Sequence, residues 1–176
     1  YAFSKFTDLI DNFISDDNAS DIEFAINVET ITACQNLDEM LKIHNISNLS
    51  SITVGRVDLA GSMEFNRSLI NTSEELEGLC RDVFIKSKKY SLKTALGGGI
   101  EKDALPIINR LNSENLIDKY ETRKVVFPAE SSKYGEESIL KAVEFELLWL
   151  KSKKRYYSGV KSEDDKRIKM LESRLN

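Results

Sequence analysis

Residues 22–58 read IEFAINVETITACQNLDEMLKIHNISNLSSITVGRVD, and this stretch decides the fold class. Apolar and polar side chains alternate over 22–28, which predicts a strand with one buried face. Thr30 can then cap a helix whose apolar residues recur at steps of three and four as far as Leu41. After a polar connection, a second strand is predicted around 52–57. The order strand, helix, strand predicts a parallel pair joined by a right-handed crossover.

The same alternation continues on both sides of this stretch. Ahead of it, the apolar residues between Phe3 and Ile14 have helical spacing, and the turn formers of Ser15–Asp21 end that helix. Behind it, further strands are predicted at 92–96 and 122–127. Further helices are predicted after the capping residues Thr72 and Ser73, after Asp103 with Pro106 in the first turn, over 136–156, and after Ser162.

Four strand–helix units are too few to close a barrel, which takes eight strands. They fit either an open doubly wound sheet or half of a barrel. The leading helix and the first residue, Tyr1, favour the half barrel with its other half upstream. We therefore expect an α/β fold, the C-terminal half of a TIM (β/α)8 barrel plus a C-terminal helical extension. We expect one domain over 1–176, with the partial barrel at about 1–135 and the C-terminal helices at about 136–176.

Composition narrows the function classes. The 176 residues carry a net charge of −4, which argues against an extended nucleic-acid surface. The sequence contains no apolar run of about 20 residues and no signal peptide at its start, so we expect a cytoplasmic protein with no membrane contact. Cys34 and Cys80 lie in predicted helices and are interpreted as reduced core residues.

Two carboxylates follow neighbouring predicted strands. Glu29 ends the strand at 22–28, and Asp58 ends the strand around 52–57. Reactive groups in parallel strand–helix architectures stand at the carboxyl ends of strands, and adjacent strands lie about 4.8 Å apart. Glu29 and Asp58 can therefore converge on one hard cation such as Mg²⁺ or Mn²⁺. The alternative is that both are capping or salt-bridged carboxylates, because acids commonly end strands.

Two segments carry a resemblance to a known family. VETITACQNLDEM at 28–40, followed by VGRVDLAGS at 54–62, resembles the hydroxy-oxo-acid aldolase / citrate lyase β-subunit family of phosphoenolpyruvate/pyruvate-binding TIM barrels. The family signature is a Glu-Thr pair before a helix containing Asn-Leu-Asp-Glu, then a Gly-x-x-Asp-Leu turn after the next strand. The resemblance is close across residues 22–62.

The resemblance implies a function as well as a fold. Glu29 and Asp58 would bind a divalent metal, Mg²⁺ or Mn²⁺, in a carbon–carbon lyase that cleaves or forms a 2-oxo acid or hydroxy acid through a metal-stabilised pyruvate enolate. A citrate-lyase-like enzyme acting on acyl-CoA esters is an alternative, and so is a non-catalytic barrel relative that serves as a scaffold. The helix at 136–156 is similar to a terminal helix that relatives pack across subunits, so the resemblance also implies a homo-oligomer.

Three further features are weighed as parts of the site. Arg56 is a candidate contact for an anionic substrate group, or it pairs with a neighbouring acid. Gly97 and Gly98 can offer backbone N–H groups to a substrate anion, or they form a plain tight turn. Glu121, at the start of the predicted strand near 122–127, either faces the pocket or forms a structural ion pair. The family also uses an Arg and a His-linked base from the first half of the barrel, which have no counterpart here.

Overall fold

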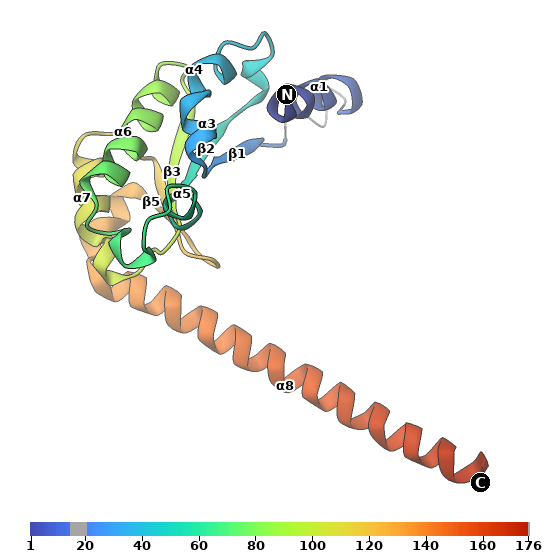
Figure 1. Cartoon of the computed structure of the whole chain (residues 1–176). Helices are drawn as coiled ribbons and strands as arrows, with labels where there is room; N and C mark the ends of the chain where they lie inside the picture. Colours follow the sequence, from blue (N-terminus) through green and yellow to red (C-terminus); the bar gives the residue numbers. More distant parts are fainter. Residues whose placement is uncertain (15–20, 176) are drawn as a thin grey trace.

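The computed structural model describes residues 1–14 and 21–175, built around a five-stranded sheet of order β1-β2-β3-β4-β5 (Figure 1). The first four strands, which pair in parallel, are β1 (Ala25–Val28), β2 (Ser51–Gly55), β3 (Lys93–Gly97) and β4 (Lys119–Glu121). The fifth strand, β5 (Val126–Pro128), is antiparallel to β4. The expected α/β class with a mostly parallel sheet is therefore confirmed. Except for Asp21, the turn predicted at Ser15–Asp21 lies outside the described residues.

The segment between the first two strands folds nearly as its sequence predicts. The Thr30 hydroxyl oxygen accepts a hydrogen bond from the Ala33 N–H at 3.1 Å and so caps the helix that follows β1. That helix is divided at Asn36 into α3 (Ile31–Gln35) and α4 (Leu37–Met40). The second strand is shorter than expected, because α5 (Arg56–Ser62) begins directly after Gly55.

Two other predicted helices are confirmed, and one predicted cap is wrong. The first helix is α1 (Ala2–Phe13), and α6 (Glu74–Lys88) is capped by the Ser73 hydroxyl, which accepts from the Leu76 N–H at 3.2 Å. Asp103 does not cap α7 (Leu105–Ser113), because it lies inside a short 3-10 helix that runs directly into α7 at Ala104. The short 3-10 helices are η1 (Ile46–Asn48), η2 (Arg67–Leu69), η3 (Lys102–Ala104) and η4 (Ala129–Tyr134).

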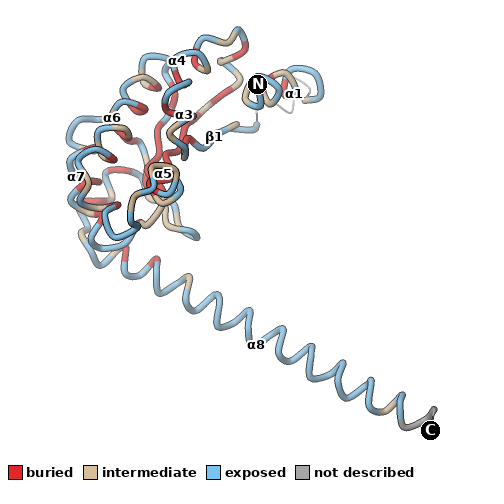
Figure 2. The backbone as a smooth tube through the Cα atoms, in the orientation of Figure 1, coloured by how far each residue is buried: buried red, intermediate tan, exposed pale blue. Residues whose placement is uncertain are grey.

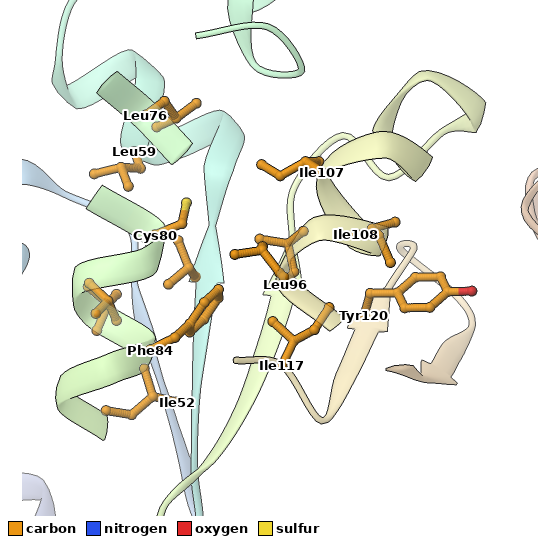
Figure 3. Close-up of a cluster of buried hydrophobic side chains, with 14 of the residues drawn as sticks. Ile52, Leu59, Leu76, Cys80, Phe84, Leu96, Ile107, Ile108, Ile117 and Tyr120 are labelled. Atoms are coloured by element: carbon orange, nitrogen blue, oxygen red, sulfur yellow. The ribbon is translucent and has the colours of Figure 1, made fainter. Parts of the chain in front are cut away.

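The core lies between the sheet and the helices α6 and α7 (Figure 3). One row of aligned strand residues faces it, and all four are fully buried: Val28, Val54, Leu96 and Tyr120. From the helices, Phe84 and Cys80 of α6 and Ile108 of α7 fill the same space with no exposed surface. Both cysteines are buried and free, as predicted, and burial raises the pKa of the Cys80 thiol to about 12.

The fourth predicted strand, at 122–127, is wrong. The structure has two short strands here, β4 and β5, joined by a tight turn. The Thr122 N–H donates to the Val125 carbonyl at 2.9 Å, and the Thr122 hydroxyl oxygen accepts from the Val125 N–H at 3.0 Å. These bonds satisfy the backbone locally and turn the chain back, so that Phe127 stacks on Tyr120 with ring centroids 5.0 Å apart.

The predicted division of the C-terminal helices at Ser162 is also wrong. Residues Glu136–Leu175 form one continuous helix, α8, which leaves the body and extends far from it (Figures 1 and 2). Ile139 and Ala142 are buried against the body, where α8 contacts mainly η3 and η4. Beyond that point nearly every residue is exposed. Ser162 and Gly159 fail to end the helix because no proline follows and neither residue prohibits helical backbone.

Candidate functional site

A row of two carboxylates and two glycines crosses the carboxyl end of the parallel sheet. The row consists of Glu29, Gly55, Gly97 and Glu121. Each of these residues directly follows a member of the buried strand row, and successive residues of a strand point to opposite faces of the sheet, so this row lies on the face away from α6 and α7. A Cβ on Gly55 would meet Glu29 Oε2 at 2.5 Å, and a Cβ on Gly97 would meet Glu121 Oε1 at 3.4 Å. The two carboxylates thus lean toward each other over neighbouring strands, in space that the glycines leave open.

Asp58 lies at the same edge. It stands in the first turn of α5, three residues after Gly55, and its side chain is exposed. Glu29 is half-buried. Within residues 1–14 and 21–175, neither carboxylate has a hydrogen bond or ion pair, so the oxygens of both remain available to a ligand. The described part of the chain holds no group of three or more His, Cys, Asp or Glu side chains placed to bind a metal.

A cleft of about 650 Å³ opens beside this edge. Acidic and basic side chains both line it, together with the glycine turn and the start of α8: Asp58, Glu121, Arg67, Arg123, Gly98 and Val143. Arg67 and Arg123 are exposed, and neither is paired with an acid in the described residues. The cleft therefore presents carboxylates and guanidinium groups to the same volume, which suits a ligand that contains both a cation and an anionic group.

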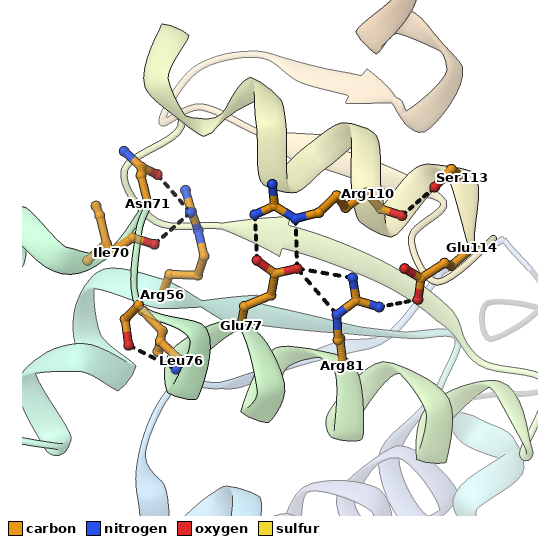
Figure 4. A network of polar contacts seen from close by, with 10 residues as sticks. Arg56, Ile70, Asn71, Leu76, Glu77, Arg81, Arg110, Ser113 and Glu114 are labelled. Carbon is orange, nitrogen blue, oxygen red and sulfur yellow. Dashed lines mark hydrogen bonds and ion pairs between the residues drawn. The ribbon is translucent and has the colours of Figure 1, made fainter.

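Arg56 does not reach this cleft. It is fully buried, and its guanidinium donates to the Ile70 carbonyl at 3.1 Å and to Asn71 Oδ1 at 2.9 Å (Figure 4). It also donates to the Gly99 carbonyl at 3.2 Å. Its Nε–H donates to the Gly97 carbonyl at 3.4 Å. Burial lowers the pKa of Arg56. Because these bonds occupy the guanidinium inside the protein, its contacts give it a structural role in place of the expected substrate contact.

The glycine turn after β3 is a place of close backbone approach. Gly98 has a φ of 76°, and a Cβ on it would meet the backbone nitrogens of Arg56 and Val57 at 2.6 and 2.7 Å. Gly99 has a φ of 65°, and a Cβ there would meet Ile70 Cδ1 at 2.3 Å. Glycine is required here because the turn passes directly over the start of α5. Gly97 itself belongs to β3 and leaves room for Glu121, whereas Gly98 lines the cleft.

A second polar cluster, on the helical side, is already satisfied. Glu77 of α6 accepts from Arg81 at 3.0 Å and from Arg110 of α7 at 2.6 Å, and Arg81 also contacts Glu114 (Figure 4). The hydrogen bond from Arg110 is the main reason that the pKa of Glu77 is lowered. This cluster joins α6 to α7, and its charges balance one another, so we regard it as structural.

Sequence reasoning left the role of Glu121 open, and the structure brings it beside the predicted site. The missing signal was the strand boundary. With a strand predicted at 122–127, Glu121 stood at its start, whereas in the structure it ends β4, at the same edge as Glu29. The correct boundary predicts the row directly, because residues at the carboxyl ends of adjacent parallel strands share one edge.

Comparisons with protein-family models, with curated proteins and with solved structures found no match. No helix in the described residues combines the length and the apolar character that crossing a lipid bilayer requires.

Proposed function

We propose that this chain carries the divalent-cation site of a carbon–carbon lyase that acts on a 2-oxo acid or hydroxy acid. The observation that carries the proposal is the position of the Glu29 carboxylate against Gly55, three residues before Asp58, at the carboxyl edge of adjacent parallel strands. The two segments that resemble the aldolase and citrate lyase family supply these same two carboxylates.

The donor chemistry fits Mg²⁺ or Mn²⁺. Both cations prefer oxygen ligands, and Mg²⁺ usually binds through one or two carboxylates while it keeps waters and substrate oxygens. Glu29 and Asp58 supply carboxylate oxygens that have no competing partner in the described residues, and the missing Cβ of Gly55 leaves space beside Glu29. When bound, the cation would supply Lewis-acid stabilisation of the negative charge that develops during bond cleavage.

The neighbouring cleft, which Asp58 lines and Glu29 does not, carries charges that bear on both the cation and the substrate. Glu121 adds negative charge on the sheet side of the cleft, which strengthens cation binding at Glu29 and Asp58. Arg67 and Arg123 stand in the same cleft, where a guanidinium can bind the carboxylate of a 2-oxo acid in a bidentate manner.

The test is a titration of the purified chain with Mn²⁺. Electron paramagnetic resonance measures the Mn²⁺ that remains free, and so gives the amount bound. Glu29→Gln and Asp58→Asn are each expected to weaken binding by about 100-fold or more, since even residues behind the ligands contribute 10–100-fold. Glu39→Gln and Asp103→Asn are matched controls, because both acids are exposed and unpaired within the described residues, and neither lines the cleft. Controls that weaken binding equally would contradict the assignment.

Activity gives a second readout. Release of pyruvate or oxaloacetate from candidate 2-oxo and hydroxy acids is expected to require Mg²⁺ or Mn²⁺ and to be lost in Glu29→Gln and Asp58→Asn. Cleavage of acyl-CoA esters alone would favour the citrate-lyase-like alternative. Absence of Mn²⁺ binding to the unmodified chain would overturn the proposal and favour the non-catalytic scaffold.

A further inference from the structure

We propose that α8 forms a parallel two-stranded coiled coil with α8 of a second copy of this chain. The starting observation is the length of the helix. Its 40 residues extend about 60 Å at 1.5 Å per residue, and only its first turns contact the body. Single helices are marginally stable in water and gain most of their stability from packing an apolar face. α8 has such a face, and no described element of its own chain covers it.

The apolar face follows a coiled-coil repeat. Positions 143, 147, 150, 154, 157, 161, 164, 168 and 171 succeed one another at alternating steps of four and three residues, which is the a/d spacing of a heptad. The apolar side chains at these positions are about half exposed: Val143, Leu147, Leu150, Tyr157, Ile168 and Leu171. The repeat therefore continues along the projecting part of the helix, beyond the contacts with the body.

Charge complementarity selects the partner and its direction. In a parallel coil, the residue before each a position faces the residue five further along the partner helix. This pairing puts Glu146 opposite Lys151 of the second copy, and Arg167 opposite its Glu172. The remaining pairs of this kind, Lys153 with Ser158 and Val160 with Asp165, bring no like charges together. An identical chain thus supplies the complementary charges without any other protein.

The seam also contains three charged residues, which restrict how the two helices can align. Lys154 and Lys161 stand at a positions and Asp164 at a d position, and in a parallel pair each of them faces its own copy, which fixes the register at a cost in stability. Asp164 follows one turn after Lys161, so acidic and basic layers are adjacent in the paired helices. The parallel direction also puts both bodies at one end of the coil.

Sedimentation equilibrium of the whole chain tests the association. The expected mass is twice 20.0 kDa for the unmodified chain. The double variant Leu150→Glu with Leu171→Glu is expected to halve it, because it puts charge into two seam layers. Ser152→Glu, on the outer side of the helix, is the matched control and should remain a dimer. A monomeric unmodified chain, or a double variant that stays dimeric, would overturn the proposal.

Disulfide formation tests the direction in a folded chain. Leu150→Cys is expected to cross-link to the same position of the second copy under mild oxidation, whereas Ser152→Cys should not. The native cysteines do not interfere, because Cys34 and Cys80 are buried. Failure of Leu150→Cys to cross-link would overturn the parallel arrangement. In a mixture of Leu150→Cys and Lys161→Cys chains, cross-links formed only between the two different variants would also overturn it, because they indicate antiparallel helices.

Discussion

The two faces of the central sheet come from the same strands but have different chemistry. In β2, Ile52 and Val54 point toward α6 and are fully buried among apolar side chains, and Arg56 continues this face beyond the strand. The residues between them, Thr53 and Gly55, point to the other face with small or polar side chains. The helical face supplies the stability of the body, and the other face keeps space and oxygen ligands available. Substitutions of neighbouring residues should therefore have very different effects.

The largest effect is expected at Arg56. Arg56→Ala should lower the free energy of unfolding by about 4 kcal/mol, because it leaves several buried carbonyl oxygens without donors and creates a cavity. Urea unfolding followed by circular dichroism measures the change. Arg67→Ala is the control, since Arg67 is exposed in the cleft and should change stability by no more than about 0.5 kcal/mol. Equal losses in the two variants would refute the structural role of Arg56.

A smaller difference is expected within the strands themselves. Leu96→Ala on the helical face should cost about 3 kcal/mol, the usual range for a fully buried leucine. Thr53→Ala on the other face should cost less than about 1 kcal/mol, because it removes one small side chain that makes no hydrogen bond to the rest of the described chain. The same unfolding measurement compares them. If Thr53→Ala were the more damaging change, the assignment of the two faces would be reversed.

At the glycines of the other face, ligand binding is a more sensitive measurement than stability. Gly55→Ala should displace the Glu29 side chain, since the new Cβ would meet Oε2 at 2.5 Å, and it should weaken Mn²⁺ binding by about 10-fold or more. The cost in stability should be about 1 kcal/mol. Gly97→Ala is the matched variant, because its nearest contact would be an ordinary 3.4 Å. Unchanged Mn²⁺ binding in Gly55→Ala would separate Glu29 from the cation site.

The sequence was sufficient wherever periodicity and capping agreed. The alternation that ends at Val28, the Thr30 cap and the Ser73 cap all predict elements that the structure contains. The errors have a common cause, which is that local signals do not reveal what competes with them. Thr122 favours a strand by type, but its hydroxyl forms the turn between β4 and β5. Ser162 is a good cap, yet nothing near it prevents the helix from continuing.

The candidate site was only partly predictable for a similar reason. Glu29 and Asp58 stand out because each follows a recognisable strand, and the structure puts both at the same edge of the sheet. Arg56 could not be interpreted from sequence, since an arginine beside a strand end can face a ligand or bind backbone carbonyls. Only the tertiary positions of Ile70 and Gly99 decide between these roles. Glu121 depended on a strand boundary that pattern alone could not locate.

The short strand β5 has a consequence for how the sheet can grow. By folding back along β4, it occupies the backbone groups at that border with its own antiparallel pairing. At the opposite border, β1 pairs with β2 alone among the described strands. Unpaired strand borders are where additional strands join a sheet. The outer border of β5 is only three residues long and ends in Pro128, which has no N–H to donate, so the four residues of β1 offer a sixth strand the longer and better-equipped border.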